Sequence, residues 1–434
     1  MKIKTVYKSY DEVMALPKAK KIKPKKPSIF FRTLVRMLSQ MDLRKARFKF
    51  TGQIDKRKGP YLILMNHSSF IDLKIAHGIL YPMPFSIVCT HDALVGKKWL
   101  MTRIGCVPTK KFVSDVSLIN DMKYALKKKK ISVLMYPEAG YSFDGKATAL
   151  PENFGRLLKI LDVPVIYIQT KGAFHRDPLY NGLKIRRVPV SAHVEQLFTK
   201  EQIKEFPIET INEKIRLAFS FDNFLWQKET GLSVSEPFRA DGLERIIYRC
   251  ANCNTEGKMR GEGTKLYCDH CGKSYTLTEF GELKADDGNT EFSHIPDWYE
   301  WERQKVREEL LSGEYTLDVP VSIGIMLDYK ALYMVGSGRL KHTLEGFCLT
   351  GCDGKLSYTQ KAISSYGLNA DYYWYEIGDV ICIGDNNALY YCFPPKDIPV
   401  AKTRLATEEL YKLYKINASC VKNIISGKTV TENK

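Results

Sequence analysis

Short apolar runs alternate with helical patterns between residues 48 and 198. Apolar runs of strand length between turn signals are typical of buried strands, whereas apolar positions spaced by three and four favour helices. The pattern predicts strands at 61–65, 85–90, 132–136 and 163–169, and helices near 69–80, 115–129 and 152–161. Such alternation favours an α/β domain with a mostly parallel sheet. We expect this domain over 46–245, with 199–245 mainly helical.

The second half of the chain has a different pattern. Its 434 residues are too many for one ordinary core, so two or three domains are expected. A cysteine-rich unit occupies 246–285, and a charged helical linker follows over 286–314, with a helix predicted at 296–312. Residues 315–398 are rich in Tyr, Val, Ile and Gly with turn signals, which predicts a small all-β domain. A final helix near 404–415 and a tail complete the predicted division at 399–434.

The first 45 residues read as a basic arm followed by an amphipathic helix. Residues 1–27 are rich in Lys and Pro and are expected to be extended or mobile, and Ser28 suits the N-cap of a helix that reaches about Met41. Apolar and polar side chains fall on different sides of this helix: Phe30, Leu34, Leu38 and Met41 on one, and Arg32, Arg36 and Ser39 on another.

Charge is concentrated in the same region. The chain has a net charge of +17, and residues 1–60 hold 18 Lys and Arg against four acids, so the rest carries only +3. A polybasic segment before an amphipathic helix is typical of proteins held at an anionic membrane surface. The alternative is a helix that packs on the main domain with a solvated basic side. No apolar run is long enough for a transmembrane helix and no secretory signal is recognised, so we expect a peripheral or monotopic protein on the cytoplasmic face of the cell membrane.

The first candidate for chemistry is Asn66-His67-Ser68-Ser69-Phe70-Ile71-Asp72, directly after the strand predicted at 61–65. His67 would lie at a strand end, where loops expose side chains. Asp72, five residues on, would lie in the first turn of the next helix. The carboxylate can keep one ring nitrogen protonated and leave the other free to accept a proton. Taken alone the pair is weak, because a lone His at a strand end is more often structural.

Three further blocks follow in order: Gly105-Cys106-Val107-Pro108-Thr109-Lys110-Lys111, Tyr136-Pro137-Glu138-Ala139-Gly140-Tyr141-Ser142 and Val163-Pro164-Val165-Ile166. We read the first as a Gly-Pro turn that leads into adjacent cations. With these blocks the chain resembles the glycerolipid (PlsC-like lysophosphatidic acid or glycerol-3-phosphate) acyltransferase family, whose motifs are Asn-His-x4-Asp, Gly-x-x-Pro-x-x-Arg, Pro-Glu-Gly-Thr-Arg-Ser and Val-Pro-Val.

The resemblance implies roles for the matching residues. His67 would be the general base and Asp72 its orienting carboxylate, and the substrate-binding residues would be Lys110, Lys111, Glu138 and Ser142. Two departures concern the acceptor head group. Lys111 replaces an Arg and loses its bidentate fork, and Tyr141 stands where the third block has its Arg. Lys110, Lys146 or Arg156 would have to compensate.

The cysteine-rich unit contains two Cys-x-x-Cys pairs, Cys250 with Cys253 and Cys268 with Cys271, separated by fourteen residues. Four thiolates at this spacing suit a structural, tetrahedral Zn²⁺. A catalytic metal is not expected, because four thiolates leave no open position. His270 lies between ligands and is not expected to be one.

The residues together favour an acyltransferase that moves a fatty acyl group from acyl-CoA or acyl-carrier protein to 1-acyl-glycerol-3-phosphate, giving phosphatidic acid without a catalytic cofactor. Glycerol-3-phosphate or another lysophospholipid is the alternative acceptor. A basic zinc-ribbon protein that binds nucleic acid is the alternative of another class. This alternative is disfavoured because the cations are concentrated in the N-terminal segment, whereas nucleic-acid-binding proteins usually carry them across one face of a folded domain. A scaffold that has lost activity is a third possibility.

Overall fold

A seven-stranded sheet lies at the centre of the first half of the molecule. The computed structural model describes residues 2–113 and 115–425. In spatial order the strands are β2 (Lys49–Gly52), β8 (Ser191–Phe198), β7 (Val165–Lys171), β3 (Leu62–Met65), β6 (Ser132–Met135), β4 (Phe85–Thr90) and β5 (Cys106–Thr109). Strands β7, β3, β6, β4 and β5 are mutually parallel, whereas β8 pairs antiparallel to β7 and parallel to β2. The sheet is therefore mixed, with five parallel strand pairs and one antiparallel pair.

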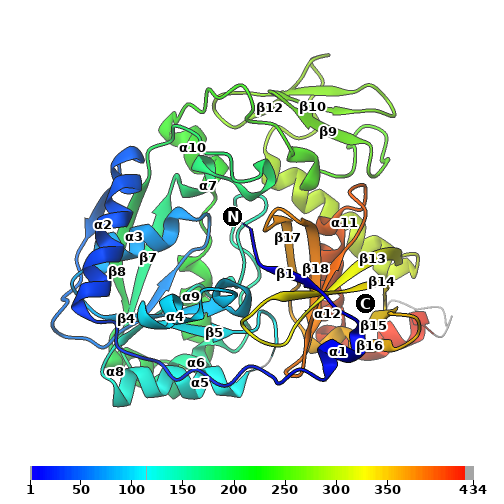
Figure 1. Cartoon of the computed structure of the whole chain (residues 1–434). Helices are drawn as coiled ribbons and strands as arrows, with labels where there is room; N and C mark the ends of the chain where they lie inside the picture. The colour runs from blue at the N-terminus through cyan, green and yellow to red at the C-terminus, as the bar shows by residue number, and fades with distance from the viewer. Residues whose placement is uncertain (1, 114, 426–434) are drawn as a thin grey trace.

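Helices cover both faces of this sheet, so the half has three layers (Figure 1). Successive residues of β3 point to opposite faces. Ile63 and Met65 pack in the core beneath α2 (Ile29–Lys45) and α3 (Ile71–Leu80). Leu62 and Leu64 pack on the other face. Helices on that face are α5 (Val116–Lys123), which continues as the π-turn η2 (Tyr124–Lys128), α6 (Phe154–Leu161), α8 (Lys200–Glu205) and α9 (Ile208–Ala218).

One sequence prediction in this half is wrong. The segment interpreted as a Gly-Pro turn contains β5, an edge strand in which Pro108 is tolerated because an edge leaves one row of N–H groups unpaired. The region 199–245 is mainly helical, as predicted, and its last long helix is α10 (Asn223–Thr230). Short helices fill other connections: η1 (His91–Leu94), α4 (Lys98–Arg103), α7 (Ala173–Arg176), η3 (Leu179–Asn181) and η4 (Leu243–Arg245).

The cysteine-rich unit forms a four-stranded antiparallel sheet, at the top of Figure 1. Its strands are β12 (Leu283–Ala285), β11 (Ser274–Leu277), β10 (Lys265–Cys268) and β9 (Met259–Glu262). Helix α11 (Ile295–Ser312) follows, one residue longer at its start than predicted.

The β-rich region forms an eight-stranded sheet. In spatial order, seven of its strands are β16 (Leu356–Lys361), β15 (Gly346–Gly351), β14 (Leu332–Thr343), β13 (Leu317–Met326), β19 (Leu389–Phe393), β18 (Gly378–Gly384) and β17 (Asn369–Trp374). The eighth strand, β1 (Thr5–Tyr7), pairs with β14. All pairs except β1–β14 are antiparallel. The short helix η5 (Ala362–Ser364) and helix α12 (Val400–Ile425) complete the second half, and one core cluster runs through the cysteine-rich unit, α11, α12 and this sheet. The division into domains at the predicted boundaries stays a prediction.

The basic arm is extended, as expected, and it joins the two halves. After β1 and α1 (Tyr10–Met14) it runs along one edge of the molecule to α2, the blue segment in Figure 1. Ile22 is buried with Leu94 and Tyr329, and Lys21 pairs with Asp121 at 3.2 Å. Ser28 caps α2 as predicted by accepting a hydrogen bond from the Phe31 N–H at 3.4 Å.

Candidate active site and metal centre

His67 follows the buried strand β3 directly, and Asp72 lies in the first turn of α3. The His67 Nδ1–H donates to Asp72 Oδ2 at 3.1 Å. The same oxygen accepts the backbone N–H groups of Ser68 at 2.7 Å and Ser69 at 2.9 Å. Asp72 is fully buried, whereas the His67 side chain is 20% exposed. The carboxylate is therefore fixed by the loop it orients, and with the proton on Nδ1 the Nε2 of His67 is left as an acceptor.

Two tyrosines enclose the imidazole. The ring of Tyr136 stacks on His67 at a centroid distance of 4.0 Å, and that of Tyr141 lies 4.2 Å away. Burial lowers the pKa of His67 below its ordinary value, against the opposing effect of Asp72, and the charge of Lys111 lowers it further. The imidazole is consequently neutral near pH 7, which is the form that accepts a proton.

Glu138 and Ser142 form hydrogen bonds with the backbone of the loop that carries His67. Glu138 accepts the His67 N–H at 2.6 Å and the Thr148 N–H at 3.1 Å, and burial raises the pKa of Glu138 to about 8. Ser142 donates its N–H to the His67 carbonyl at 3.1 Å and its hydroxyl to the Lys146 carbonyl. Neither is among the described residues that line the cavity beside His67. Their geometry is that of positioning residues, whereas the resemblance implies substrate contact.

A cavity of about 1460 Å³ opens beside His67, and both halves of the molecule line it. The acyltransferase half contributes an apolar wall that includes Leu73, Val88 and Leu157. The second half contributes every residue from Asp371 to Glu376. An apolar groove that ends at a base and a polar wall suits a substrate with a long acyl chain and a polar head.

Lys110 and Lys111 both line this cavity, but they differ in their partners. The Lys110 ammonium donates to the backbone carbonyls of Asp385 at 3.3 Å and Asn386 at 2.7 Å, in the turn between β18 and β19. Burial lowers the pKa of Lys110. Lys111 has no hydrogen bond or ion pair among the described residues, so it is the better placed of the two to bind an anionic group. Lys146 and Arg156, named as substitutes for the missing Arg, are not among the lining residues described.

Sequence reasoning missed part of this site. Tyr141 was noted only as a replaced Arg, and nothing in its spacing predicted that its ring would lie beside the imidazole of His67. Nothing in the local sequence marked residues 371–376, because their place in the wall results from long-range packing of β17 against the first half.

The four predicted metal ligands lie together. The sulfur atoms of Cys250, Cys253, Cys268 and Cys271 all lie within 4.8 Å of one another. Cys250 Sγ is 3.7 Å from Cys271 Sγ, and Cys253 Sγ is 3.8 Å from Cys268 Sγ. Zinc–sulfur bonds of about 2.3 Å in a tetrahedron place sulfurs about 3.8 Å apart. The cluster can therefore hold a metal ion. His270 instead lies 3.3 Å from the hydroxyl of Thr255.

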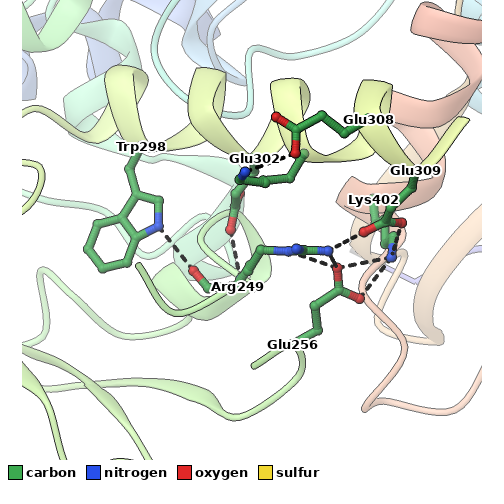
Figure 2. A network of polar contacts seen from close by, with 8 residues as sticks. Arg249, Glu256, Trp298, Glu302, Glu308, Glu309 and Lys402 are labelled. Atoms are coloured by element: carbon green, nitrogen blue, oxygen red, sulfur yellow. Dashed lines mark hydrogen bonds and ion pairs between the residues drawn. The ribbon is translucent and has the colours of Figure 1, made fainter. Parts of the chain in front are cut away.

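Polar contacts connect the cysteine-rich unit to helices α11 and α12 (Figure 2). The guanidinium of Arg249, which is adjacent to Cys250, pairs with Glu256 and with Glu309 of α11. The backbone N–H of Arg249 donates to Glu302 at 2.7 Å. Lys402 of α12 pairs with Glu256 at 2.9 Å and with Glu309 at 2.7 Å. Ion pairs and hydrogen bonds thus hold the metal-binding unit against helices α11 and α12.

Helix α12 also reaches the loop after Glu138. The Arg404 guanidinium lies 4.1 Å from the ring centroid of Phe143, which itself lies 4.6 Å from that of Tyr372. The position of α12 is therefore linked by direct packing to the loop that supports His67.

The matches to known proteins agree with this geometry. Residues 47–168 match a family model described as Acyltransferase. The fold and the site thus define an α/β acyltransferase core. This part of the chain is thus similar to the acyltransferase family that the four sequence blocks resemble, and the match supports acyl transfer in glycerolipid synthesis.

Two further searches complete the comparison. The solved structure of the 1-acyl-sn-glycerophosphate (LPA) acyltransferase PlsC from Thermotoga maritima aligns with 43% of this chain and 76% of its own, at 16% identity and a TM-score of 0.35. A search of curated proteins finds no match.

Proposed function

We propose that the chain transfers a fatty acyl group from acyl-CoA or acyl-carrier protein to the hydroxyl of a lysoglycerophospholipid. The four sequence blocks favour 1-acyl-glycerol-3-phosphate as acceptor and phosphatidic acid as product. One observation carries the proposal: the Asp72-bound imidazole of His67 faces a cavity large enough for an acylated lipid.

The reaction follows from this geometry. The acceptor hydroxyl gives its proton to Nε2 of His67 as its oxygen attacks the thioester carbonyl, and the imidazolium that forms is stabilised by Asp72. The tetrahedral intermediate collapses, the carbon–sulfur bond breaks, and the leaving thiolate takes a proton. A positioned base of this kind contributes roughly 10²–10⁴-fold to the rate.

Membrane association is the second part of the proposal. Helix α2 packs on the sheet half through Phe31, Val35 and Leu43. It leaves its predicted apolar side exposed, which disfavours the alternative in which the helix presents a solvated basic side. The exposed apolar side chains, 38–67% accessible, are Ile29, Phe30, Leu34, Met37, Leu38 and Met41. None of the helices described in the structure is long and apolar enough to span a bilayer.

The third part is that the cysteine cluster holds a structural Zn²⁺. The sulfur spacing supports this, as does the choice of four thiolates, which zinc prefers. The ion would contribute to folding and to the position of α11 and α12 and would take no part in the chemistry.

A second acceptor class has specific support. Lys111 is a single cation where the resembled family offers a bidentate Arg, and Tyr141 replaces the third-block Arg, so a lysophospholipid with a larger head group and less negative charge is the alternative acceptor.

Lipid mass spectrometry tests the proposal. The purified chain is incubated with labelled acyl-CoA or acyl-carrier protein and with each lysophospholipid in turn, and labelled diacyl product is expected. Absence of acyl transfer to every glycerolipid acceptor would overturn it, and retention of RNA in place of vesicle flotation at physiological salt would favour the nucleic-acid alternative.

A further inference from the structure

The end of strand β17 forms a wall of the active-site cavity. We call residues 371–376 the β17 turn. All six line the cavity. Three of them, Tyr373, Tyr375 and Glu376, have positive φ values of 48°, 49° and 66°, and the ladder with β18 is irregular between Asp371 and Trp374. Left-handed conformations at non-glycine residues cost free energy and are kept where surrounding contacts impose them, which is common at binding sites.

Contacts with the acyltransferase half hold the β17 turn in place. The Tyr375 hydroxyl donates to Asp92 Oδ2 at 3.0 Å, and Tyr372 packs against Phe143. The Tyr372 hydroxyl also donates to the Arg245 carbonyl at 2.7 Å. The turn is therefore a fixed part of the site rather than a neighbouring surface.

Most cations of the cavity wall already have partners. Lys74 pairs with Asp42, Lys184 with Asp241 at 2.7 Å and Arg245 with Asp379 at 3.7 Å. Lys110 is held by backbone carbonyls. Among the cavity cations whose contacts the structure gives, Lys111 alone faces the cavity without a hydrogen bond or ion pair.

Most carboxylates of the wall are also satisfied. Asp92 accepts from Tyr375, Asp115 caps α5, and Glu244 accepts the Gly261 N–H at 3.0 Å. Among the described residues, Asp371 accepts a hydrogen bond only from the N–H of its neighbour Tyr372, at 2.8 Å. Burial raises the pKa of Asp371 to about 6, against the opposing effect of the Lys111 charge. At neutral pH this carboxyl is mainly ionised.

Among the described residues of the wall, Lys111 and Asp371 are therefore the cation and the carboxylate left available to bind a head group. A phosphate monoester carries about −1.5 to −2 at pH 7 and needs more than one cation. A phosphodiester carries a single negative charge, which Lys111 matches, and an ammonium group would match Asp371. A second phosphate charge beside Asp371 would be repelled.

We propose that the β17 turn forms a head-group subsite for zwitterionic lysophospholipids, in which Lys111 binds the phosphodiester and Asp371 binds an ammonium group. This inference rests on the proposed function and selects between its two acceptor classes.

The test compares three acceptors with the same acyl chain: 1-acyl-glycerophosphoethanolamine, 1-acyl-glycerophosphoglycerol and 1-acyl-glycerol-3-phosphate. The full-length chain is expected to use the first with a kcat/KM at least about tenfold above either anionic acceptor. In Asp371→Asn, which keeps the side-chain size, that preference is expected to fall at least about tenfold. Asp397→Asn is the matched control, because this exposed carboxylate of the same half is not among the described residues that line the cavity, and the preference is expected to be unchanged.

The outcomes separate the two proposals. Acyl transfer with an equal or better rate for an anionic acceptor, or a preference that survives Asp371→Asn, overturns the subsite and leaves the proposed function standing. No acyl transfer to any of the three, nor to glycerol-3-phosphate, overturns the proposed function and the subsite with it.

Discussion

The two halves of this molecule contribute to one cavity in different ways. The acyltransferase half brings the base, its carboxylate and an apolar groove, all within about one hundred residues that carry recognisable blocks. The second half contributes the β17 turn, together with helices α11 and α12, which share a core with the eight-stranded sheet. Its sequence carries no pattern that we recognise as catalytic. The base and its carboxylate are thus specified within one short stretch of sequence, whereas the shape and charge of the acceptor site depend on contacts between distant parts of the chain.

The largest expected effect is in the first half. His67→Ala is expected to lower kcat/KM by about 10²–10⁴-fold, because the acceptor hydroxyl loses its base. Steady-state kinetics with labelled acyl donor provide the measurement. His193→Ala is the control, since the His193 side chain is exposed and, among the described residues, hydrogen-bonds to Thr51. Undiminished activity in His67→Ala would refute the assigned mechanism.

In the second half the corresponding experiment changes stability rather than chemistry. Cys253→Ser is expected to abolish stoichiometric zinc and to lower the Tm by on the order of 10 °C, because the cluster shares a core with α11, α12 and the eight-stranded sheet. Elemental analysis and thermal unfolding measure both. Cys348→Ser, outside the cluster, controls for loss of a thiol. Zinc loss with an unchanged Tm would show that the cluster does not stabilise this half.

A smaller effect concerns the exposed side of α2. The double variant Met37→Glu and Met41→Glu is expected to weaken flotation with anionic vesicles by at least about tenfold, since each Met loses roughly 1.5–3 kcal/mol of apolar burial. Leu217→Glu, an equally exposed apolar position on α9, is the matched control. Equal flotation of both variants and the parent would separate α2 from membrane binding.

The sequence predicted the centre of the first half well, since buried runs such as β4 have the predicted bounds. It failed where local pattern and tertiary context differ. Strand β5 contains Pro108, which reads as a turn and is tolerated only because the strand lies at the edge. The pattern identified the apolar side of α2, but which side packs on α3 depends on partners that periodicity does not reveal.

The same limit applies to the site. His67, Asp72 and the four cysteines were predicted from spacing, and the structure places each set together. Glu138 and Ser142 were assigned to substrate by resemblance, whereas their contacts are with the His67 loop. Asp371 lies about three hundred residues from His67 in the chain, and only the folded contacts of β17 bring it to the same cavity.

The pH dependence of kcat/KM tests the central claim most directly, because it reports the ionisation of the free enzyme's base. Burial keeps the pKa of His67 below its ordinary value of 6.5, and a protonated imidazole cannot accept the acceptor's proton. We predict that kcat/KM is level near pH 7 and that any fall on the acid side has its midpoint below pH 6.5. An acid limb with its midpoint above 6.5 would contradict a neutral His67 held by Asp72.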